Sequence, residues 1–97
     1  MNEKTNKQQK RFDDAENMAI SLLSENEKKY KNKINNDHPY LLANIAFIYD
    51  FQGLFYKSNP YHMRLVNPDY DISFLDNDFK ISILNNAGFN FMSLGIY

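Results

Sequence analysis

The chain has 97 residues, a formal net charge of −1, no cysteine and no tryptophan. This length supports one domain with a modest core and excludes barrels and doubly wound cofactor folds. Without cysteine the chain forms no disulfide, thiolate metal site or cysteine nucleophile, so the expected location is the reducing cytoplasm.

Two further properties concern the membrane and the origin of the gene. No segment reaches the roughly 18 to 20 apolar residues that a membrane helix needs, and no apolar run follows the charged N-terminus as it would in a secretory signal. Residues encoded by A/T-rich codons are abundant, whereas the chain has one Val and two Arg. This bias indicates an A/T-rich genome, such as that of a low-GC bacterium, its phages or its plasmids.

The first third of the chain is polar, with the pattern of a helix. Residues 1–9 contain no apolar residue after Met1, and we expect them to form a disordered tail. From Lys10 to Ile34 there is no Gly or Pro, and apolar residues recur at steps of three and four, which predicts a helix. We therefore assign residues 10–97 to a single domain that begins with this helix.

The segment that follows has two interpretations. Asp37 as an N-cap, Pro39 in the first turn and an apolar stripe that includes Leu42 and Ile45 predict a second helix over 38–51. The alternative is a hairpin within residues 40–56, because the aromatic residues there suit strands equally well.

The C-terminal half has the pattern of β structure. Asn-Pro pairs at 59–60 and 67–68 are turn signals. Residues 72–75 and 79–83 alternate apolar and polar side chains as in a hairpin, and residues 89–94 are a predicted last strand. The predicted fold class is therefore α+β, with one or two N-terminal helices packed on a small antiparallel sheet formed by the C-terminal half.

A first short motif is acidic. Pro68-Asp69, followed by Asp78-Phe79-Lys80, resembles the signature of PD-(D/E)xK nucleases. The resemblance implies that Asp69 and Asp78 are ligands of a divalent metal and that Lys80 activates the attacking water. The alternative is turn chemistry, because Asp and Asn favour turns and Lys80 alternates outward from the core.

A second motif is aromatic. The segment Gly88-Phe-Asn-Phe-Met-Ser-Leu94 resembles the first ribonucleoprotein motif of RNA-recognition domains, in which two aromatic residues on a strand stack on bases. The resemblance implies that Phe89 and Phe91 are the two stacking residues. The alternative is that both side chains lie on the side of a strand that faces the hydrophobic core. A basic N-terminal tip offers further nucleic-acid-binding candidates, chiefly Lys10 and Arg11, with Lys4 and Lys7 before them.

Catalytic and metal-binding patterns are otherwise missing from the sequence. His38 and His62 have no histidine partner at ligand-pair spacing, and no glycine-rich phosphate loop or nucleophile elbow is present. We therefore expect no catalytic residue, no metal site and no cofactor.

The aromatic content favours binding over catalysis. Seven Tyr and eight Phe exceed what a small core readily buries, and Tyr is enriched at protein interfaces. We expect a non-enzymatic protein that binds a macromolecular partner, first of all a protein, and blocks it sterically, as a phage or plasmid inhibitor or modulator of a host enzyme would. The alternatives are a nucleic-acid-binding protein and a metal-dependent nuclease. The predicted partner-binding residues are Tyr49, Tyr56, Tyr61, Tyr70, Asp69, Asp71, Asp76 and Asp78.

Overall fold

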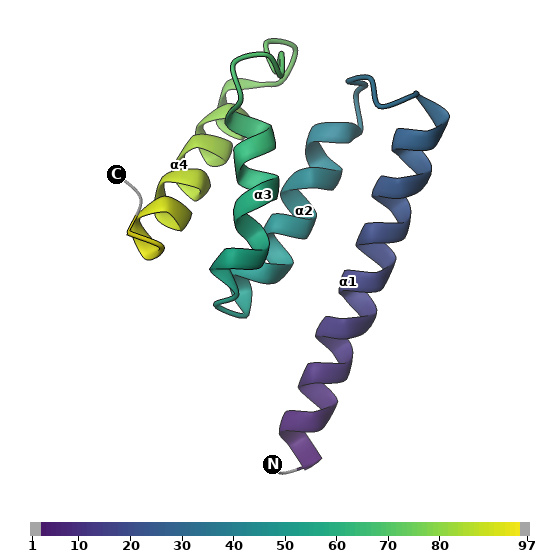
Figure 1. Cartoon of the computed structure of the whole chain (residues 1–97), viewed down its shortest axis with the longest axis vertical. Coiled ribbons are helices and arrows are strands. Elements are labelled where there is room, and N and C mark those ends of the chain that lie inside the picture. Colours follow the sequence, from purple (N-terminus) through teal and green to yellow (C-terminus); the bar gives the residue numbers. More distant parts are fainter. Residues whose placement is uncertain (1–2, 96–97) are drawn as a thin grey trace.

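Residues 3–95 of the chain fold into four α-helices (Figure 1). The computed structural model describes the backbone of residues 3–95 and the side chains of residues 6–95, and this part of the chain contains no strand. The predicted α+β class is therefore wrong, and so are the strands predicted at 72–75, 79–83 and 89–94. The helices are α1 (Glu3–Lys29), α2 (His38–Phe51), α3 (Phe55–Val66) and α4 (Asn77–Ser93).

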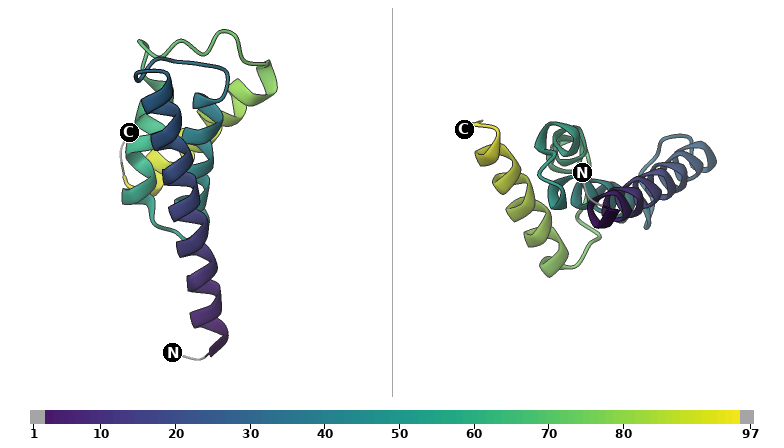
Figure 2. Two further views of the ribbon diagram at one scale, coloured as in Figure 1. Left: turned by 90° about the vertical axis from the view of Figure 1, so that its right-hand side faces the viewer. Right: turned by 90° about the horizontal axis from the view of Figure 1, so that it is seen from below.

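The helices lie side by side in the order of the sequence. The principal contacts join α1 to α2, α2 to α3 and α3 to α4, so α1 and α4 flank a central α2–α3 pair (Figures 1 and 2). The molecule measures 45 × 35 × 20 Å, the shape of a thin layer. Each outer helix therefore has its main packing partner on one side, which limits how much apolar surface the fold buries.

α1 is longer than the predicted helix at its N-terminal end. It begins at Glu3, so residues 3–9, for which a disordered tail is predicted, form its first turns. These turns extend beyond the other three helices (Figure 1).

At its C-terminal end α1 stops at Lys29 and does not reach Ile34. Lys31 and Asn32 adopt left-handed backbone conformations with φ angles of 54° and 63°, which end the helix. The side-chain amides of Asn26 and Asn35 exchange two hydrogen bonds of 2.9 Å and so hold the turn closed.

The predicted helix over 38–51 is confirmed as α2, and the alternative hairpin within 40–56 is wrong. Pro39 lies in the first turn, where its missing N–H costs no intrahelical hydrogen bond. The capping of α2 differs from the prediction, because the side chain of Asp37 accepts no hydrogen bond from the first turn of the helix. Oδ1 of Asn35 instead accepts from the backbone N–H of His38 at 3.2 Å.

α3 occupies a segment for which turns and strands are predicted. Gly53, with a φ of 74°, lets the chain reverse between α2 and α3. Pro60 lies inside α3, so the Asn-Pro pair at 59–60 is not a turn. The buried side chains of α3 are Ser58, His62 and Leu65, which share one helix face.

α4 carries apolar side chains on two faces. Phe79 and Ile83 pack toward the core, whereas Ile81 is exposed on the other side of the helix. The three alternate with polar residues in the sequence, which explains why they imitate a strand. Asp76 is the N-cap, and its Oδ1 accepts a hydrogen bond of 2.8 Å from the backbone N–H of Phe79.

The hydrophobic core is small and centred on α2, which supplies three of its seven buried members. Many large apolar side chains stay exposed, although no helix between residues 3 and 95 is long and apolar enough to cross a membrane. The core members are Leu23, Leu42, Ile45, Tyr49, Leu65, Leu75 and Ile83.

Candidate functional site

A cleft of about 240 Å³ lies between α2, α3 and α4. Pockets for small molecules commonly measure roughly 300 to 1,000 Å³, so the volume of this cleft suits a few side chains of a partner better than a large cofactor. The lining is apolar with a few polar groups. It consists of Ala43, Phe47, Asp50, Phe51, His62, Leu65, Phe79, Ser82, Ile83, Asn86 and Phe89.

Three of the lining side chains are exposed aromatic rings. Phe47, Phe51 and Phe89 are 62%, 68% and 59% exposed. Phe47 and Phe51 lie one turn apart on α2 with ring centroids 5.9 Å apart, and Phe12 of α1 lies 5.8 Å from Phe51. Large rings in contact with water carry a hydrophobic cost that a covering partner would remove, and contiguous exposed apolar groups mark interaction sites.

A carboxylate–imidazole pair lines the same cleft. Nε2 of His62 donates a hydrogen bond of 2.7 Å to Oδ2 of Asp50, and both side chains are largely buried. Oδ1 of Asp50 is buried and has no hydrogen-bond partner among the described residues. A buried acceptor left unpaired costs about 1–3 kcal/mol, and a donor on a bound molecule could pair with it only if the Asp50 side chain turned toward the cleft.

The other polar groups of the cleft do not extend this pair. Ser82 lines the cleft, yet between residues 6 and 95 no hydrogen bond joins it to His62. Nor does this part of the chain contain a group of three His, Asp or Glu side chains placed to hold a metal ion. What the described groups provide is mainly apolar contact, with the polar side chains of Asp50, Ser82 and Asn86 among it.

A second polar cluster holds the helices that form the cleft. Nε2 of His38 donates to Glu27 of α1 at 3.0 Å, and Nδ1 accepts from the hydroxyl of Tyr70 at 2.5 Å. Arg64 of α3 also pairs with Glu27. Burial raises the pKa of Glu27, but the hydrogen bonds from His38 and Arg64 and the positive charge of Arg64 outweigh burial and hold this pKa below its ordinary value. The cluster therefore ties α1, α2 and α3 together while Glu27 is ionised.

The same cluster predicts a loss of stability in alkaline solution. Burial and the nearby Glu27 raise the pKa of Tyr70 from 10.0 to about 12, against the opposing effect of Arg64. A raised folded-state pKa contributes stability that is complete below pH 10 and is lost as the pH rises toward 12. We expect Tyr70→Phe to remove this part of the alkaline loss, as measured by urea unfolding from neutral pH upward.

The control for this prediction is Tyr56→Phe. Tyr56 is 83% exposed, and its variant should keep the alkaline loss of the original chain. Burial also raises the pKa of Tyr49, so the Tyr70→Phe variant should retain a smaller alkaline loss. Identical pH profiles for Tyr70→Phe and the original chain would contradict the prediction.

The predicted partner-binding tyrosines do not share one environment. Tyr56 is exposed, whereas Tyr49 is buried and its hydroxyl donates to Glu16 at 2.6 Å. Tyr61 and Tyr70 are half-buried. The exposed aromatic side chains of the cleft are phenylalanines, so the expectation that Tyr49 lies at the surface is wrong.

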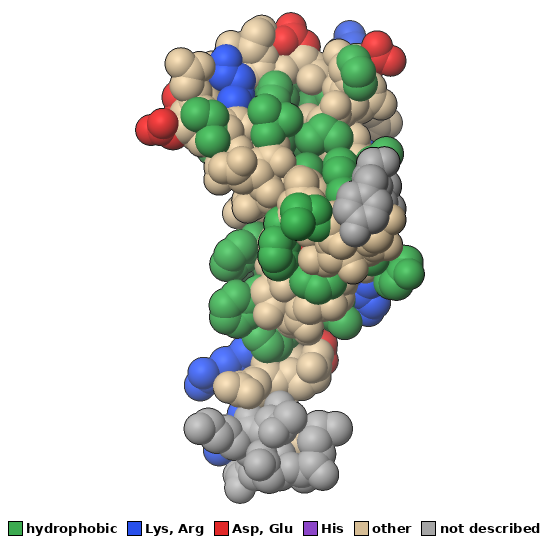
Figure 3. Space-filling model, turned by 90° about the vertical axis from the view of Figure 1, so that its left-hand side faces the viewer, with side chains coloured by type: hydrophobic (Ala, Val, Ile, Leu, Met, Phe, Trp, Pro, Cys, Tyr) green, Lys and Arg blue, Asp and Glu red, His purple; other side chains and the backbone are tan. Residues whose placement is uncertain are grey.

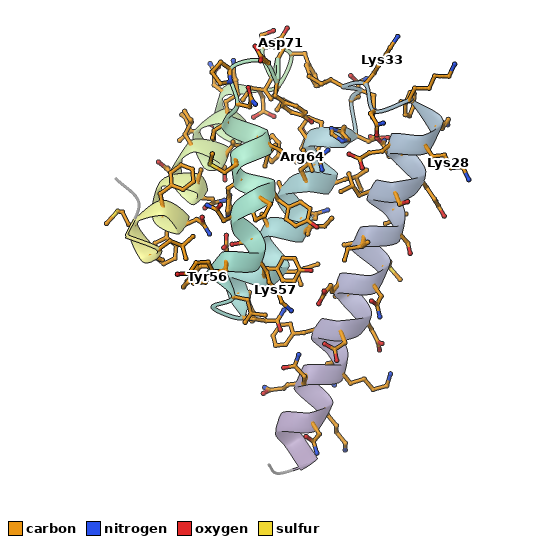
Figure 4. All side chains as sticks on the ribbon, in the orientation of Figure 1. Lys28, Lys33, Tyr56, Lys57, Arg64 and Asp71 are labelled. Atoms are coloured by element: carbon orange, nitrogen blue, oxygen red, sulfur yellow. The ribbon has the colours of Figure 1, made fainter. Side chains whose placement is uncertain are left out.

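The four predicted aspartates are exposed but lie away from Tyr56. Asp69 and Asp71 belong to the loop between α3 and α4, Asp76 caps α4, and Asp78 lies in its first turn. Figure 4 shows Asp71 above the upper end of α3 and Tyr56 near the lower end of that helix. The predicted set therefore does not form one continuous surface, and the role of its members in binding remains a prediction.

The structural context of both family motifs is absent. Phe89 and Phe91 lie on α4, so the strand that would present them to bases does not exist. Asp78 and Lys80 lie on the same helix, and Asp69 lies in a loop, so the strand of the nuclease signature is missing too.

The basic candidates of the N-terminal tip lie on the projecting part of α1. Lys10 and Arg11 are exposed, and Lys10 forms an ion pair of 3.2 Å with Asp14 one turn on. The side chain of Lys4 lies outside the described residues, and the backbone at Lys7 belongs to the same helix. Their role in nucleic-acid binding stays a prediction.

Sequence reasoning missed the cleft itself. The spacing of Phe47 and Phe51 places them on one face once a helix over 38–51 is accepted, which is a usable signal. The Asp50–His62 pair has no such signal, because it depends on the packing of α2 against α3. No protein-family model matches the chain, and no curated protein or solved structure is significantly similar to it.

Proposed function

We propose that the chain is a non-enzymatic binding protein whose cleft between α2, α3 and α4 receives an amphipathic helix of a protein partner. The observation that carries this proposal is the presence of exposed phenylalanine rings around a cleft whose lining includes the acidic side chain of Asp50. Apolar side chains of the incoming helix would cover Phe47, Phe51 and Phe89, as in other helix-in-groove complexes.

The charge of the cleft supports a basic anchor on the partner helix. Asp50 is the acidic residue of the cleft lining. A Lys or Arg side chain would supply both a donor and the opposite charge, and such charge-assisted hydrogen bonds are the stronger kind. An acidic side chain at this point would be rejected.

Binding of this kind works by covering a surface of the partner. A protein of 11.5 kDa that covers a helix on the surface of an enzyme can block or modulate that enzyme sterically. The A/T-rich composition supports a low-GC bacterium or one of its mobile elements as the place to seek that partner.

The test is capture of the partner from a low-GC bacterial lysate treated with nuclease, with Phe47→Glu as the cleft variant. We expect the original chain to retain one protein in stoichiometric amount. Phe47→Glu should retain at least about tenfold less, because a charge replaces an aromatic contact of the kind that is worth roughly 2 kcal/mol or more at an interface. Asp50→Asn should weaken capture as well, since it removes the negative charge.

Met63→Glu is the matched control. Met63 is an exposed apolar residue of α3 outside the cleft lining, so its variant should capture the partner like the original chain. Equal capture by the Phe47→Glu and Met63→Glu variants would refute the role of the cleft. Capture that is lost on nuclease treatment would favour the nucleic-acid alternative, in which Lys10 and Arg11 are the candidate contacts.

A further inference from the structure

The outward face of α4 carries a row of exposed apolar side chains. Ile81, Leu84 and Met92 are 54%, 61% and 68% exposed, and Gly88 lies between the last two on the same face. We refer to Ile81, Leu84, Gly88 and Met92 as the outer stripe. Their steps of three and four residues are those of helices that pair along a seam.

This face lacks the charges that exposed helix faces normally carry. Residues 81–97 contain no Asp, Glu, Lys, Arg or His, although α4 is an outer helix of the layer. Figure 3, which faces this side of the molecule, shows hydrophobic side chains over its upper and middle parts with few charged side chains between them. An uncharged apolar helix face is typical of a surface that another helix covers.

We propose that the outer stripe pairs with the outer stripe of a second copy of this chain, with the two α4 helices antiparallel. In a two-fold dimer the same patch meets itself, so the outer stripe must be complementary to its own reversed copy. Residues 81–97 contain no charged side chain, so neither copy buries a charge without a partner.

Side-chain size selects the antiparallel direction. In a parallel pair, Leu84 of each chain would meet its own copy, and so would Gly88. In an antiparallel pair, Ile81 lies opposite Met92, and Leu84 lies opposite Gly88. A Cβ at Gly88 would meet nothing within 4 Å in its own chain, so the space beside Gly88 is open to a side chain of the other copy.

The outer stripe is separate from the cleft. The cleft is lined on the α4 side by residues that include Phe79, Ser82 and Ile83, and none of the four stripe residues lines it. Dimerisation through the outer stripe therefore leaves the cleft accessible, and this inference does not depend on the proposed function.

Sedimentation equilibrium over a series of protein concentrations tests the pairing. One short helix face gives a small interface, so we expect a mass of 11.5 kDa in dilute solution that rises toward twice this value at high concentration. Leu84→Glu and Met92→Glu should stay at the monomer mass at all concentrations and retain the far-ultraviolet circular dichroism of the original chain. Met63→Glu, a matched change of an exposed apolar residue on α3, should still dimerise.

Disulfide trapping tests the direction of the pairing, because the chain has no cysteine of its own. A mixture of the Ile81→Cys and Met92→Cys variants should form a mixed disulfide dimer on oxidation, whereas each variant alone should form little. Cross-linking of each variant with itself would show a parallel pair and overturn the antiparallel dimer. A monomer at every concentration, or a dimer that survives Leu84→Glu, would overturn the proposal.

Discussion

Replacing Leu42 by Ala is expected to lower the free energy of unfolding by about 2–5 kcal/mol. Leu42 has no exposed surface and belongs to the single core cluster, which joins α1, α2, α3 and α4. Truncation removes buried methyl groups and leaves a cavity that four separate elements would have to close. Domains of ordinary stability have about 5–15 kcal/mol in total, so this variant should lose a large share of its stability.

Urea unfolding followed by circular dichroism measures this loss. Leu84→Ala is the matched control, because it makes the same change at an exposed position of α4 and should shift the free energy of unfolding by no more than about 0.5 kcal/mol in dilute solution. In thermal unfolding the difference should appear as a fall of about 4–8 °C for each kcal/mol. Equal stabilities of the two variants would show that the core is not centred on α2.

The sequence predicted α2 because the spacing of its apolar residues and the position of Pro39 both indicate a helix. The buried face of α3, in contrast, is largely polar. Of its buried residues Ser58, His62 and Leu65, two are polar. The apolar residues of α3, among them Tyr61 and Leu65, do recur with a helical period, but the Asn-Pro pair at 59–60 indicates a turn. The polar residues are buried because they find partners in other elements, which no local pattern contains.

α4 was mistaken for strands for a related reason. Its two apolar faces, one against α3 and one exposed, combine into the alternation of Phe79, Ile81 and Ile83 that is typical of a strand. The Asp and Asn residues around position 76 suggest a turn equally well, since an N-cap and a turn use the same side chains.

The candidate site could be predicted only in part. Phe47 and Phe51 follow from the helix over 38–51, so the aromatic rim on α2 was accessible to sequence reasoning. The hydrogen bond between Asp50 and His62 requires α3 to lie against α2, and the wrong β interpretation of the C-terminal half contains no helix that would bring His62 to Asp50. Because α3 was not predicted, the part of the candidate site that α3 supplies could not be predicted either.

Asn90→Asp is expected to lower the free energy of unfolding by about 3–5 kcal/mol at neutral pH, the cost of an unpaired buried charge. Asn90 is fully buried, and its side chain joins α4 to α3. Nδ2 donates to the carbonyl oxygen of Phe55 at 3.1 Å and to Oγ of Ser58 at 2.7 Å, while Oδ1 accepts from Asn59 at 2.9 Å. A carboxylate has the same size but no donor, so one of its oxygens would face the Phe55 carbonyl.

The deficit of the Asn90→Asp variant should depend on pH. Burial raises the pKa of a carboxyl group above its unfolded value of about 3.9, so the folded variant is stabilised by protonation. Its deficit relative to the original chain should therefore be small below the unfolded pKa and should grow as the pH rises through the folded-state pKa. Protonation also restores one donor for Phe55 or Ser58.

Urea unfolding at neutral and at mildly acidic pH separates this account from a simple loss of packing. Asn85→Asp makes the same change at an exposed position of α4, and it should cost no more than about 0.5 kcal/mol with little dependence on pH. A deficit of Asn90→Asp that stays constant on acidification would mean that the amide acts through its shape. A deficit that shrinks would mean that α4 is held to α3 by the two donors of Asn90, and hence that one side of the cleft depends on a buried amide and not on apolar packing alone.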